Sequence, residues 1–410
     1  MNSGDTAWVL TASALVLLMT IPGLAFFYGG LVRRKNVLSI LMQCFIIVCV
    51  ISLQWMLFGY SLAFGPSFHG IIGNLDWIGL SGVGALPNPD YSKTIPHSVF
   101  MIFQAMFAII TPALIIGAYA ERVKFSAFLL FTILWATFVY DPLAHWVWNP
   151  GGWLRGLGAL DFAGGIVVHV SSGISALVLA LLLGKRIGYN HKPIRPHNLP
   201  FTVLGAALLW FGWFGFNAGS ALAADGLAGN AFITTHIATA AAGLTWALVE
   251  WWHNGTPTIL GAATGAVAGL VAITPACGFV NPMNAVFIGM IVAMVCYTAV
   301  AIIKGKLGYD DSLDAFGVHG VGGAVGTIAT GLFAEKAVNA AGANGLFFGN
   351  AHQLFVQFLS LLVAVAFAAF MTFIIYKIVD AVLGMRVEEK NELIGLDLTQ
   401  QSEAAYTVIE

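Results

Sequence analysis

The sequence predicts an all-α polytopic membrane protein. Three observations predict this class: 59% of the 410 residues are hydrophobic, only 9% are charged, and long stretches carry no charged side chain. An ordinary soluble domain has roughly 45–50% apolar and about 25% charged residues. A water-soluble globule is therefore excluded.

Charge and cysteine content exclude further classes. The 17 Lys and Arg residues against 19 Asp and Glu residues give a net charge of -2, so the chain lacks the basic surface that nucleic-acid binding requires. The four cysteines, Cys44, Cys49, Cys277 and Cys296, lie in apolar stretches without a CxxC pair. We expect neither a disulfide framework nor a zinc site, and no cofactor.

Eleven membrane spans are predicted from the charge-free stretches. A spanning helix needs about 20 mostly apolar residues to cross a hydrocarbon core of roughly 30 Å. The first seven candidates lie between charged residues, at 5–33, 35–76, 93–121, 124–141, 161–185, 195–225 and 225–250. The first is interpreted as a retained span, because the residues before it include Asp5 and no basic residue, unlike a secretory signal.

The remaining four spans need a boundary inside a long apolar region. Residues 251–303 carry no charge, but the segment TPACGFVNP at 274–282 contains two prolines and a glycine, which separates an eighth span from a ninth. The tenth span runs from about 315 to 334 and the eleventh from about 354 to 376. The predicted membrane domain covers residues 1–385, and residues 386–410 form a polar tail.

Orientation follows from the positions of the basic residues, since Lys and Arg favour cytoplasmic loops. With the amino terminus outside, only Lys93, Arg155 and Lys336 lie on the outer side. The other 14 lie on the cytoplasmic side: Arg33, Arg34, Lys35, Arg122, Lys124, Lys185, Arg186, Lys192, Arg195, Lys304, Lys306, Lys377, Arg386 and Lys390. The predicted topology has the amino terminus outside and the carboxyl terminus inside.

An internal repeat relates the two halves of the predicted bundle. Asp161 precedes His169 by eight residues at the start of the fifth span, and Asp311 precedes His319 by eight at the start of the tenth. Both pairs are offset by 150 residues, and the two spans enter from opposite sides. The pattern predicts a 5+5 inverted repeat, with repeats at about 7–185 and 200–334 and one additional helix.

The repeated residue pairs indicate both a structural and a functional role. The aspartates are expected to cap helix amino termini. Helix rise would place each histidine about 12 Å inward from its aspartate, and a polar side chain at that depth normally faces a cavity. Two adjacent imidazoles can share a proton and stay neutral, which suits a small polar solute that sheds a proton. His236, without a partner in the repeat, is interpreted as a packing residue.

Aromatic residues gather near the outer ends of two predicted spans. The segment WFGWFGFNAGS occupies residues 210–220, and Trp148 lies at the outer end of the fourth span. Many membrane tryptophans are interfacial anchors. A cluster of Trp and Phe faces around an outer vestibule would also attract a monovalent cation by cation–π interaction.

These segments resemble the ammonium transporter family, the Amt/Mep group related to Rhesus proteins. The likeness covers nearly the whole chain. Its segments follow one another in the order expected of the family: PGLAFFYGGLVRRKN, DFAGGIVVHVSSGISA, WFGFNAGS, TPACGF and DAFGVHG.

The resemblance implies a homotrimer in the cell membrane, in which each eleven-helix subunit has its own pore. Ammonium would be recruited outside and deprotonated, and ammonia would cross a hydrophobic pore, with net charge transfer suggested by the family. The implied residues are Trp148, Phe107 and Ser220 for the external ammonium site, Phe107 and Phe216 for the gate, and His169, His319 and Trp213 for the pore, with Asp161 and Asp311 in structural support.

The tail has its own implied role. Four acidic residues, Glu388, Glu389, Glu392 and Asp397, lie among its first twelve. The segment GLDLTQQSEAAY resembles the tail that, in relatives, packs across the inner face and helps couple the pores to a PII-type signal protein. The other interpretation of this tail is a solvated terminus.

Three other functions have weaker support from the sequence. An ammonium sensor with little flux shares the same membrane domain. A membrane haem protein would use histidines on spanning helices as axial ligands, but it would want two on each helix, where spans five and ten carry one apiece. An enzyme is not expected, because the sequence contains no HExxH, GxSxG or GxxxxGK[ST] motif.

Overall fold

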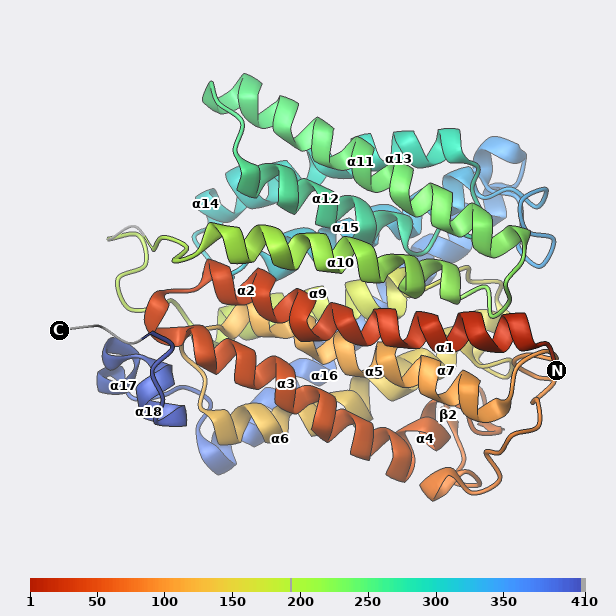
Figure 1. Cartoon of the computed structure of the whole chain (residues 1–410), viewed down its shortest axis with the longest axis horizontal. Coiled ribbons are helices and arrows are strands. Elements are labelled where there is room, and N and C mark those ends of the chain that lie inside the picture. The colour runs from red at the N-terminus through yellow and green to blue at the C-terminus, as the bar shows by residue number, and fades with distance from the viewer. Residues whose placement is uncertain (192–193, 407–410) are drawn as a thin grey trace.

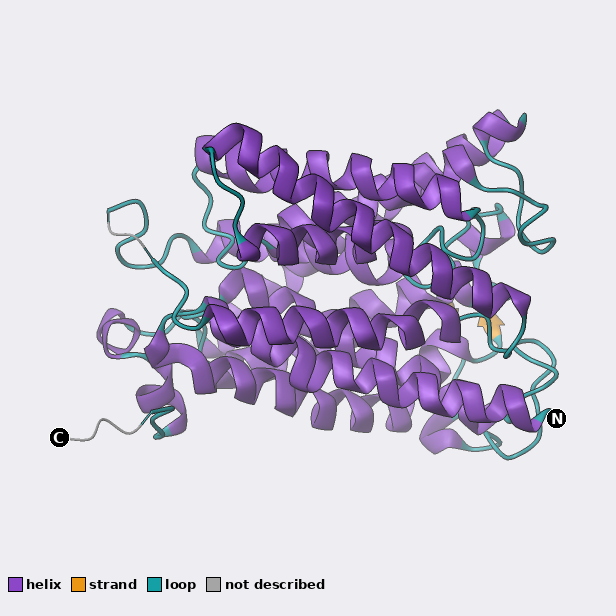
Figure 2. Cartoon of the chain, turned by 45° about the horizontal axis from the view of Figure 1, so that its top comes forward, coloured by secondary structure: helices purple, strands orange, loops and turns teal. Residues whose placement is uncertain are grey.

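The computed structural model describes residues 1–191 and 194–406 and is a bundle of long helices (Figures 1 and 2). In chain order the α-helices are α1 (Ser3–Leu18), α2 (Ala25–Leu31), α3 (Val37–Gln54), α4 (Tyr60–Phe64), α5 (His97–Tyr119), α6 (Phe125–Trp135), α7 (Asp141–Trp148), α8 (Trp153–Gly156), α9 (Ser171–Leu183), α10 (Leu199–Gly219), α11 (Gly226–Asn254), α12 (Ile259–Ile273), α13 (Pro282–Tyr297), α14 (Lys304–Leu307), α15 (Val321–Phe333), α16 (Ala351–Leu383), α17 (Glu389–Ile394) and α18 (Leu396–Gln401).

Short turns of other helix types lie within or beside these helices. The π-helical turns are η1 (Met19–Leu24), η3 (Trp55–Gly59), η5 (Ala136–Tyr140), η6 (Gly165–Val170), η7 (Thr298–Ile303) and η8 (Phe316–Gly320), and the 3-10 turns are η2 (Arg34–Asn36), η4 (Ile78–Leu80) and η9 (Leu346–Phe348). The strands β1 (Ser67–Phe68) and β2 (Ile72–Gly73) form one antiparallel hairpin. The predicted all-α class is confirmed.

Ten helical segments in the described part of the chain are long and apolar enough to cross a membrane. They are Ser3–Leu31, Arg34–Phe64, His97–Tyr119, Phe125–Gly156, Gly165–Leu183, Leu199–Gly219, Gly226–Asn254, Pro282–Leu307, Phe316–Phe333 and Ala351–Leu383. The predicted eighth span corresponds to α12, which is apolar but has only 15 residues. The total of eleven spans and their orientation remain predictions.

The fourth predicted span extends past Asp141, where its charge-free stretch ends. The helix continues through α7 to Trp148, and Asp141 is fully buried inside it. The sequence rule took any charged side chain as a boundary. Here a neighbouring helix supplies a partner, because Gln54 Nε2 donates to Asp141 Oδ2 at 2.8 Å.

The helical segments Gly165–Leu183 and Phe316–Phe333, which correspond to the fifth and tenth predicted spans, begin later than their aspartates. Their first turns, η6 and η8, start at Gly165 and Phe316, whereas Asp161 and Asp311 lie in the preceding irregular segments. The depth of about 12 Å estimated from eight residues of continuous helix is therefore wrong, since fewer helical residues separate each aspartate from its histidine.

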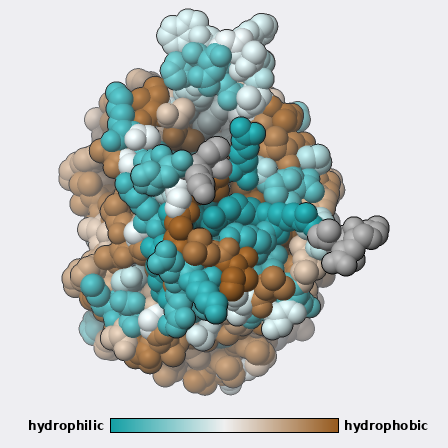
Figure 3. All heavy atoms as spheres, turned by 90° about the vertical axis from the view of Figure 1, so that its left-hand side faces the viewer, coloured by the Kyte–Doolittle hydropathy of each residue, from teal (hydrophilic) through white to brown (hydrophobic). Residues whose placement is uncertain are grey.

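The two ends of the bundle differ. Residue 1 lies at one end of the long axis and the tail at the other (Figure 1), and these are called the N-end and the C-end below. Figure 3 looks onto the C-end, where hydrophilic side chains cover the middle and hydrophobic ones surround them. Lys192, one of the basic residues assigned to the cytoplasmic side, lies outside the described residues.

Glycines bring the two repeated helical segments into direct contact. A Cβ on Gly173 of α9 would collide with the backbone of Gly320 in η8. A Cβ on Gly323 of α15 would lie 3.0 Å from the Cβ of His169 in η6. Small residues let helix backbones approach this closely. The contact places η6 and η8, which carry the two predicted pore histidines, side by side in the centre of the bundle.

Candidate functional site

Asp161 and Asp311 each cap the first turn of a repeated helical segment with the same geometry. In each, Oδ1 accepts from the N–H four residues on, at 2.6 Å for Gly165 and 3.1 Å for Ala315. In each, Oδ2 accepts from the N–H five residues on, at 2.8 Å for both Ile166 and Phe316.

Asp161 makes two further bonds of this kind, with the N–H groups of Gly164 and Val167. Helix amino termini leave such donors unpaired, and a carboxylate also suits the positive end of the helix dipole. The caps fix the positions of the turns that carry the histidines.

His169 and His319 meet in the buried centre of the bundle. Their ring centroids are 5.3 Å apart and the ring planes are 14° from parallel, so the rings stack. His169 also stacks on Trp213 of α10, with centroids 5.4 Å apart. The three residues are buried: His169, His319 and Trp213 are 1%, 4% and 1% exposed.

The polar edges of the two imidazoles have no protein partner. Within the described residues, Nδ1 and Nε2 of His169 and Nδ1 of His319 make no hydrogen bond, and none joins the two rings. The hydrogen bond between imidazoles considered from the sequence is absent in this geometry, because the rings face each other rather than meeting edge to edge. Their nitrogens are left to interact with a solute.

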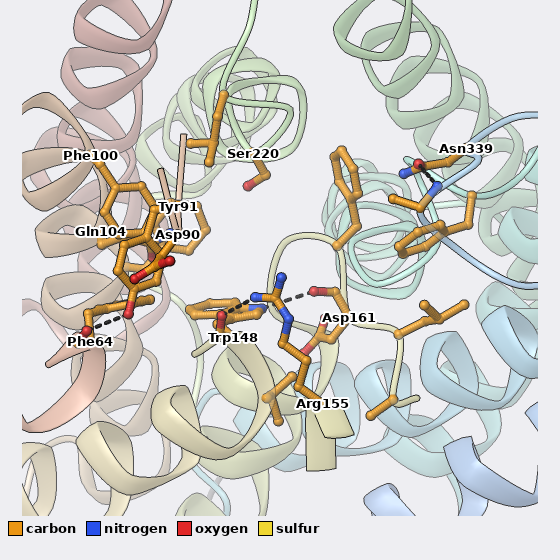
Figure 4. A pocket seen from close by; sticks show the side chains of 18 of the residues that line it. Phe64, Asp90, Tyr91, Phe100, Gln104, Trp148, Arg155, Asp161, Ser220 and Asn339 are labelled. Atoms are coloured by element: carbon orange, nitrogen blue, oxygen red, sulfur yellow. Dashed lines mark hydrogen bonds between the residues drawn. The ribbon is translucent and has the colours of Figure 1, made fainter. Parts of the chain in front are cut away.

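A cavity of about 400 Å³ opens at the N-end of the bundle. Its lining includes Trp148, Phe107, Ser220 and Asp161, and Trp148 lies next to Asp161 (Figure 4). Trp148 Nε1 donates to the backbone oxygen of Asp161 at 2.9 Å, so the polar edge of the indole is already bonded. Ser220 Oγ donates to Phe216 O at 2.9 Å, which leaves the hydroxyl oxygen free to accept.

A continuous line of aromatic rings connects this cavity to the histidines. Phe107 meets Trp148 edge to face, with centroids 5.7 Å apart and planes at 87°. Phe107 and Phe216 lie 4.3 Å apart at 32°, and Phe216 lies 6.1 Å from His169. Phe107 lines the cavity floor and Phe216 packs against it, and the two residues are 1% and 0% exposed.

Trp213 is held by a residue from another element. Its Nε1 donates to Thr274 Oγ1 at 2.9 Å, and Thr274 follows α12 in the segment that separates the predicted eighth and ninth spans. Indole N–H groups usually find a partner when buried. This bond fixes the indole face against His169.

A second cavity, of about 190 Å³, approaches the histidines from the C-end. It reaches His319 and Val318, and Tyr28, Glu250 and Asp314 also line it. From the N-end cavity to the second cavity, the implied site residues therefore follow the order Trp148, Phe107, Phe216, His169 and His319. All the residues named from the sequence for recruitment, gate and pore lie along this one path.

Charged residues form a network at the C-end, away from the path. Glu121 pairs with Arg33 at 2.8 Å and with Arg186 at 3.1 Å, and Asp310 pairs with Arg186 at 2.8 Å and with Arg122 at 3.7 Å. Burial alone would raise the pKa of Asp310, but the hydrogen bonds and charge of Arg186 lower it below the ordinary value. Burial lowers the pKa of Arg122 to about 10.

Sequence reasoning missed several residues that line the N-end cavity. Gln104, Tyr91, Asp90 and Arg155 all contribute to its wall (Figure 4). Gln104 had a signal that was not used, since it is a polar residue in the middle of the third predicted span. Tyr91 and Asp90 lie in a loop, where neither periodicity nor charge distinguishes them. Burial raises the pKa of Tyr91 well above its usual range.

Two other sequence hypotheses can be placed. His236 lies on an exposed face of α11, where its ring packs near Trp210 and Phe214 of α10, and it does not line either cavity. Among the described residues no cluster of three His, Cys, Asp or Glu side chains could hold a metal ion. The stacked His169 and His319 rings also do not aim their nitrogens at a shared iron, as haem ligation requires.

Comparison with known proteins gives consistent likenesses over the whole chain. A sequence model described as the Ammonium Transporter Family matches residues 7–406. The chain is 56% identical to an ammonium transporter of Bacillus subtilis, over 99% of each chain. It is 48% identical to the ammonium transporter Amt1 of Archaeoglobus fulgidus, over 99% of this chain and 100% of the relative.

Solved structures show the same fold. The crystal structure of Saccharomyces cerevisiae Mep2 has a TM-score of 0.89 and 38% identity, covering 95% of this chain and 88% of the other. A structure titled Sensor Amt Protein has a TM-score of 0.90 and 31% identity, covering 97% of this chain and 98% of the other.

Proposed function

The chain belongs to the ammonium transporter family, and from that premise we propose that it draws ammonium into the N-end cavity, removes its proton and conducts ammonia past His169 and His319. The family predicted from five sequence segments is confirmed, and the chain is a multi-pass membrane transporter protein. The observation that carries the finer proposal is the path of rings between two cavities, with the unpartnered imidazoles at its centre.

Recruitment is assigned to Trp148, Phe107 and Ser220. The indole N–H of Trp148 is bonded to Asp161 O, so its π-face is the part left to attract a cation. The Ser220 oxygen can accept a hydrogen bond from ammonium, which has only donors. Asp161 lines the cavity but its carboxylate is bonded to four backbone N–H groups, so it acts as support and not as the main ligand.

Proton loss is assigned to the passage past Phe107 and Phe216. These buried rings offer no polar atom, and moving an ion out of water without a partner is costly. Neutral ammonia crosses the same contact at much lower cost. The ring pair therefore acts as a gate that favours the deprotonated solute.

Conduction beyond the gate is assigned to His169, His319 and Trp213. The free imidazole nitrogens can accept from or donate to ammonia in turn, and the stacked rings keep the passage narrow. The second cavity gives the solute an exit at the C-end. The proton passes to water in the N-end cavity when ammonium meets the gate, and it crosses the membrane separately from ammonia, which makes net transport carry charge.

The proposal is tested with the purified protein in liposomes. An ammonium pulse should produce a change of internal pH larger than that of protein-free liposomes, together with an ammonium-dependent current, because the proton also crosses. A folded, reconstituted protein that gives neither response would overturn the proposal.

A second candidate, an ammonium sensor with little flux, is supported by the likeness to the structure titled Sensor Amt Protein. The two functions differ in flux per molecule. Binding of ammonium with no internal pH change would favour the sensor, and sustained turnover would exclude it.

We further propose a homotrimer in the cell membrane, with the N-end outside. Large apolar side chains are exposed along α11, α13 and α16, which suits lipid or a neighbouring copy. His236 is exposed on α11 in the middle of a span, and a polar group at that depth favours contact with protein over lipid. The mass of the detergent-solubilised complex, corrected for bound detergent, tests the trimer.

The tail is proposed as a regulatory segment that meets a PII-type signal protein at the C-end. It is docked on the bundle: Asp397 Oδ1 accepts from Ser39 N at 2.8 Å, Asn36 Oδ1 accepts from Leu396 N at 2.8 Å, and Glu392 Oε1 accepts from Ile187 N at 2.7 Å. Truncation after Gly384 should change transport and abolish partner binding. Retention of both would contradict the role.

A further inference from the structure

Helix α7, which ends at Trp148, carries a stripe of buried polar side chains. Asp141, His145 and Asn149 follow one another at intervals of four residues and are 0%, 0% and 3% exposed. This spacing places them on one face of the helix. We call these three residues the α7 seam.

The seam bonds α7 and its C-cap to the helical segment Arg34–Phe64 and to Gly65, which follows it. At one end Gln54 Nε2 of α3 donates to Asp141 Oδ2 at 2.8 Å. In the middle His145 Nδ1 donates to Ala63 O of α4 at 2.9 Å, because a carbonyl can only accept. At the other end Asn149 Nδ2 donates to Gly65 O at 3.0 Å. The neighbouring residue, Trp148, forms part of the N-end cavity.

Asp141 and Gln54 each have an oxygen without a donor. Both Asp141 Oδ1 and Gln54 Oε1 are buried and make no hydrogen bond in the described structure. In the described residues no basic side chain lies within ion-pair distance of Asp141. A carboxylate buried without a cation is strongly unfavourable, and such a group takes up a proton instead. The proton supplies the donor that both unpaired oxygens lack.

The surroundings offer no other charge partner. The elements packed against α7 are α4, α8, β2, η5 and η6, and α3 reaches Asp141 through Gln54. Their titratable or charged side chains, with the one on α7 itself, are Cys44, Cys49, Tyr60, Tyr140, His145, Arg155 and His169. None of them is hydrogen-bonded to Asp141.

We propose that Asp141 is a neutral carboxylic acid inside the membrane span and that, bonded to Gln54, it positions α7 so that Trp148 faces Phe107 at the cavity floor. This inference rests on the proposed function for its effect on transport, but not for the protonation state. Asp141 does not touch the path itself. It is a positioning residue, acting through the height and rotation of α7.

Infrared spectroscopy of the full-length protein tests the protonation state without any transport measurement. The wild type should show a carboxylic-acid C=O band that persists from mildly acidic to mildly basic pH and is lost in Asp141→Asn. The matched control Asp76→Asn, at an exposed loop position, should leave that band intact. Absence of an Asp141-dependent band would overturn the proposal.

Transport kinetics test the positioning role. Asp141→Asn keeps a neutral planar group that can both accept from and donate to Gln54, so its apparent KM for ammonium should equal that of the wild type. Asp141→Leu breaks the bond and should raise the apparent KM about tenfold, with a smaller change in Vmax.

The outcomes separate this inference from the proposed function. An inactive but folded Asp141→Asn would mean that an ionised carboxylate is needed and would contradict the proposal, as would an Asp141→Leu variant with unchanged KM. If Asp141→Leu does not fold, the infrared band and the Asp141→Asn kinetics still decide. A wild-type protein that moves no ammonium would refute the proposed function and leave the infrared result standing.

Discussion

Trp148 uses one part of its ring for a structural hydrogen bond and another part for the proposed recruitment of ammonium. The Nε1 edge is bonded to Asp161 O, and the ring contacts Phe107 at the cavity floor. A cation held over such a ring gains about 0.5–2 kcal/mol, more when water is excluded. Under the proposed function, the face of the indole, and not its N–H, is therefore the part that holds ammonium.

Replacing this residue tests that assignment. Trp148→Leu should raise the ammonium concentration for half-maximal transport about tenfold, since about 1.4 kcal/mol of cation–π attraction is lost. Concentration-dependent uptake into proteoliposomes measures it. The control Trp252→Leu, at a residue that is 88% exposed, should behave as the wild type. Equal affinities for both variants would count against the recruitment role.

The spacing of residues in the sequence predicted the roles of some site residues and not of others. The histidine pair emerged because Asp161–His169 and Asp311–His319 repeat with one offset, and the structure stacks those rings. The stacking itself could not be predicted, since it depends on glycines such as Gly323 that let η6 and α15 approach. Asp141 was misread as a boundary because its partner, Gln54, lies 87 residues earlier in the chain.

The first turns η6 and η8 are two elements that are capped with the same side-chain geometry. Asp161 accepts four backbone N–H groups and Asp311 accepts two. Each aspartate thereby sets where a histidine-bearing turn begins. Capping was predicted from the sequence, but the helix start was not, because an aspartate side chain can reach donors several residues ahead.

Because Asp161 accepts more hydrogen bonds than Asp311, we expect the asparagine variants at the two positions to lose different amounts of stability. An asparagine keeps one acceptor oxygen and turns an amide N–H₂ toward the remaining donors. Asp161→Asn should therefore destabilise the protein by about 2 kcal/mol or more, and Asp311→Asn by about half as much, as charge-assisted hydrogen bonds contribute about 1.5–3 kcal/mol. Thermal unfolding in detergent compares them. A larger loss for Asp311→Asn would be inconsistent with the capping account.

In the molecule as a whole, the buried ion network holds the C-end together. Arg33, Glu121, Arg186 and Asp310 come from segments that follow or precede four different spans, and they meet in one cluster. The positions of the basic residues predicted that Arg33 and Arg186 lie on the same side of the membrane. They could not predict how the charges pair, because that requires knowing which loops are neighbours.

The network predicts sensitivity to acid. Because the pKa of Asp310 is lowered by Arg186, its contribution to stability is present above the ordinary value of about 3.9 and is lost as pH falls through the lower folded value. Thermal stability of the wild type should therefore drop below about pH 4 more steeply than that of Asp310→Asn, which starts lower. Asp76→Asn serves as an exposed control and should follow the wild type. Parallel curves for wild type and Asp310→Asn would argue against this role.

The most direct test of the whole account compares ion selectivity before and after removal of one central ring. Proteoliposomes with wild type, His169→Ala or the exposed control His352→Ala receive separate pulses of ammonium and potassium while the current is recorded. Wild type and control should respond to ammonium only, whereas His169→Ala should also pass potassium, because the space left by the ring admits water and a hydrated ion. A His169→Ala protein that still excludes potassium and transports ammonium like the wild type would contradict the account.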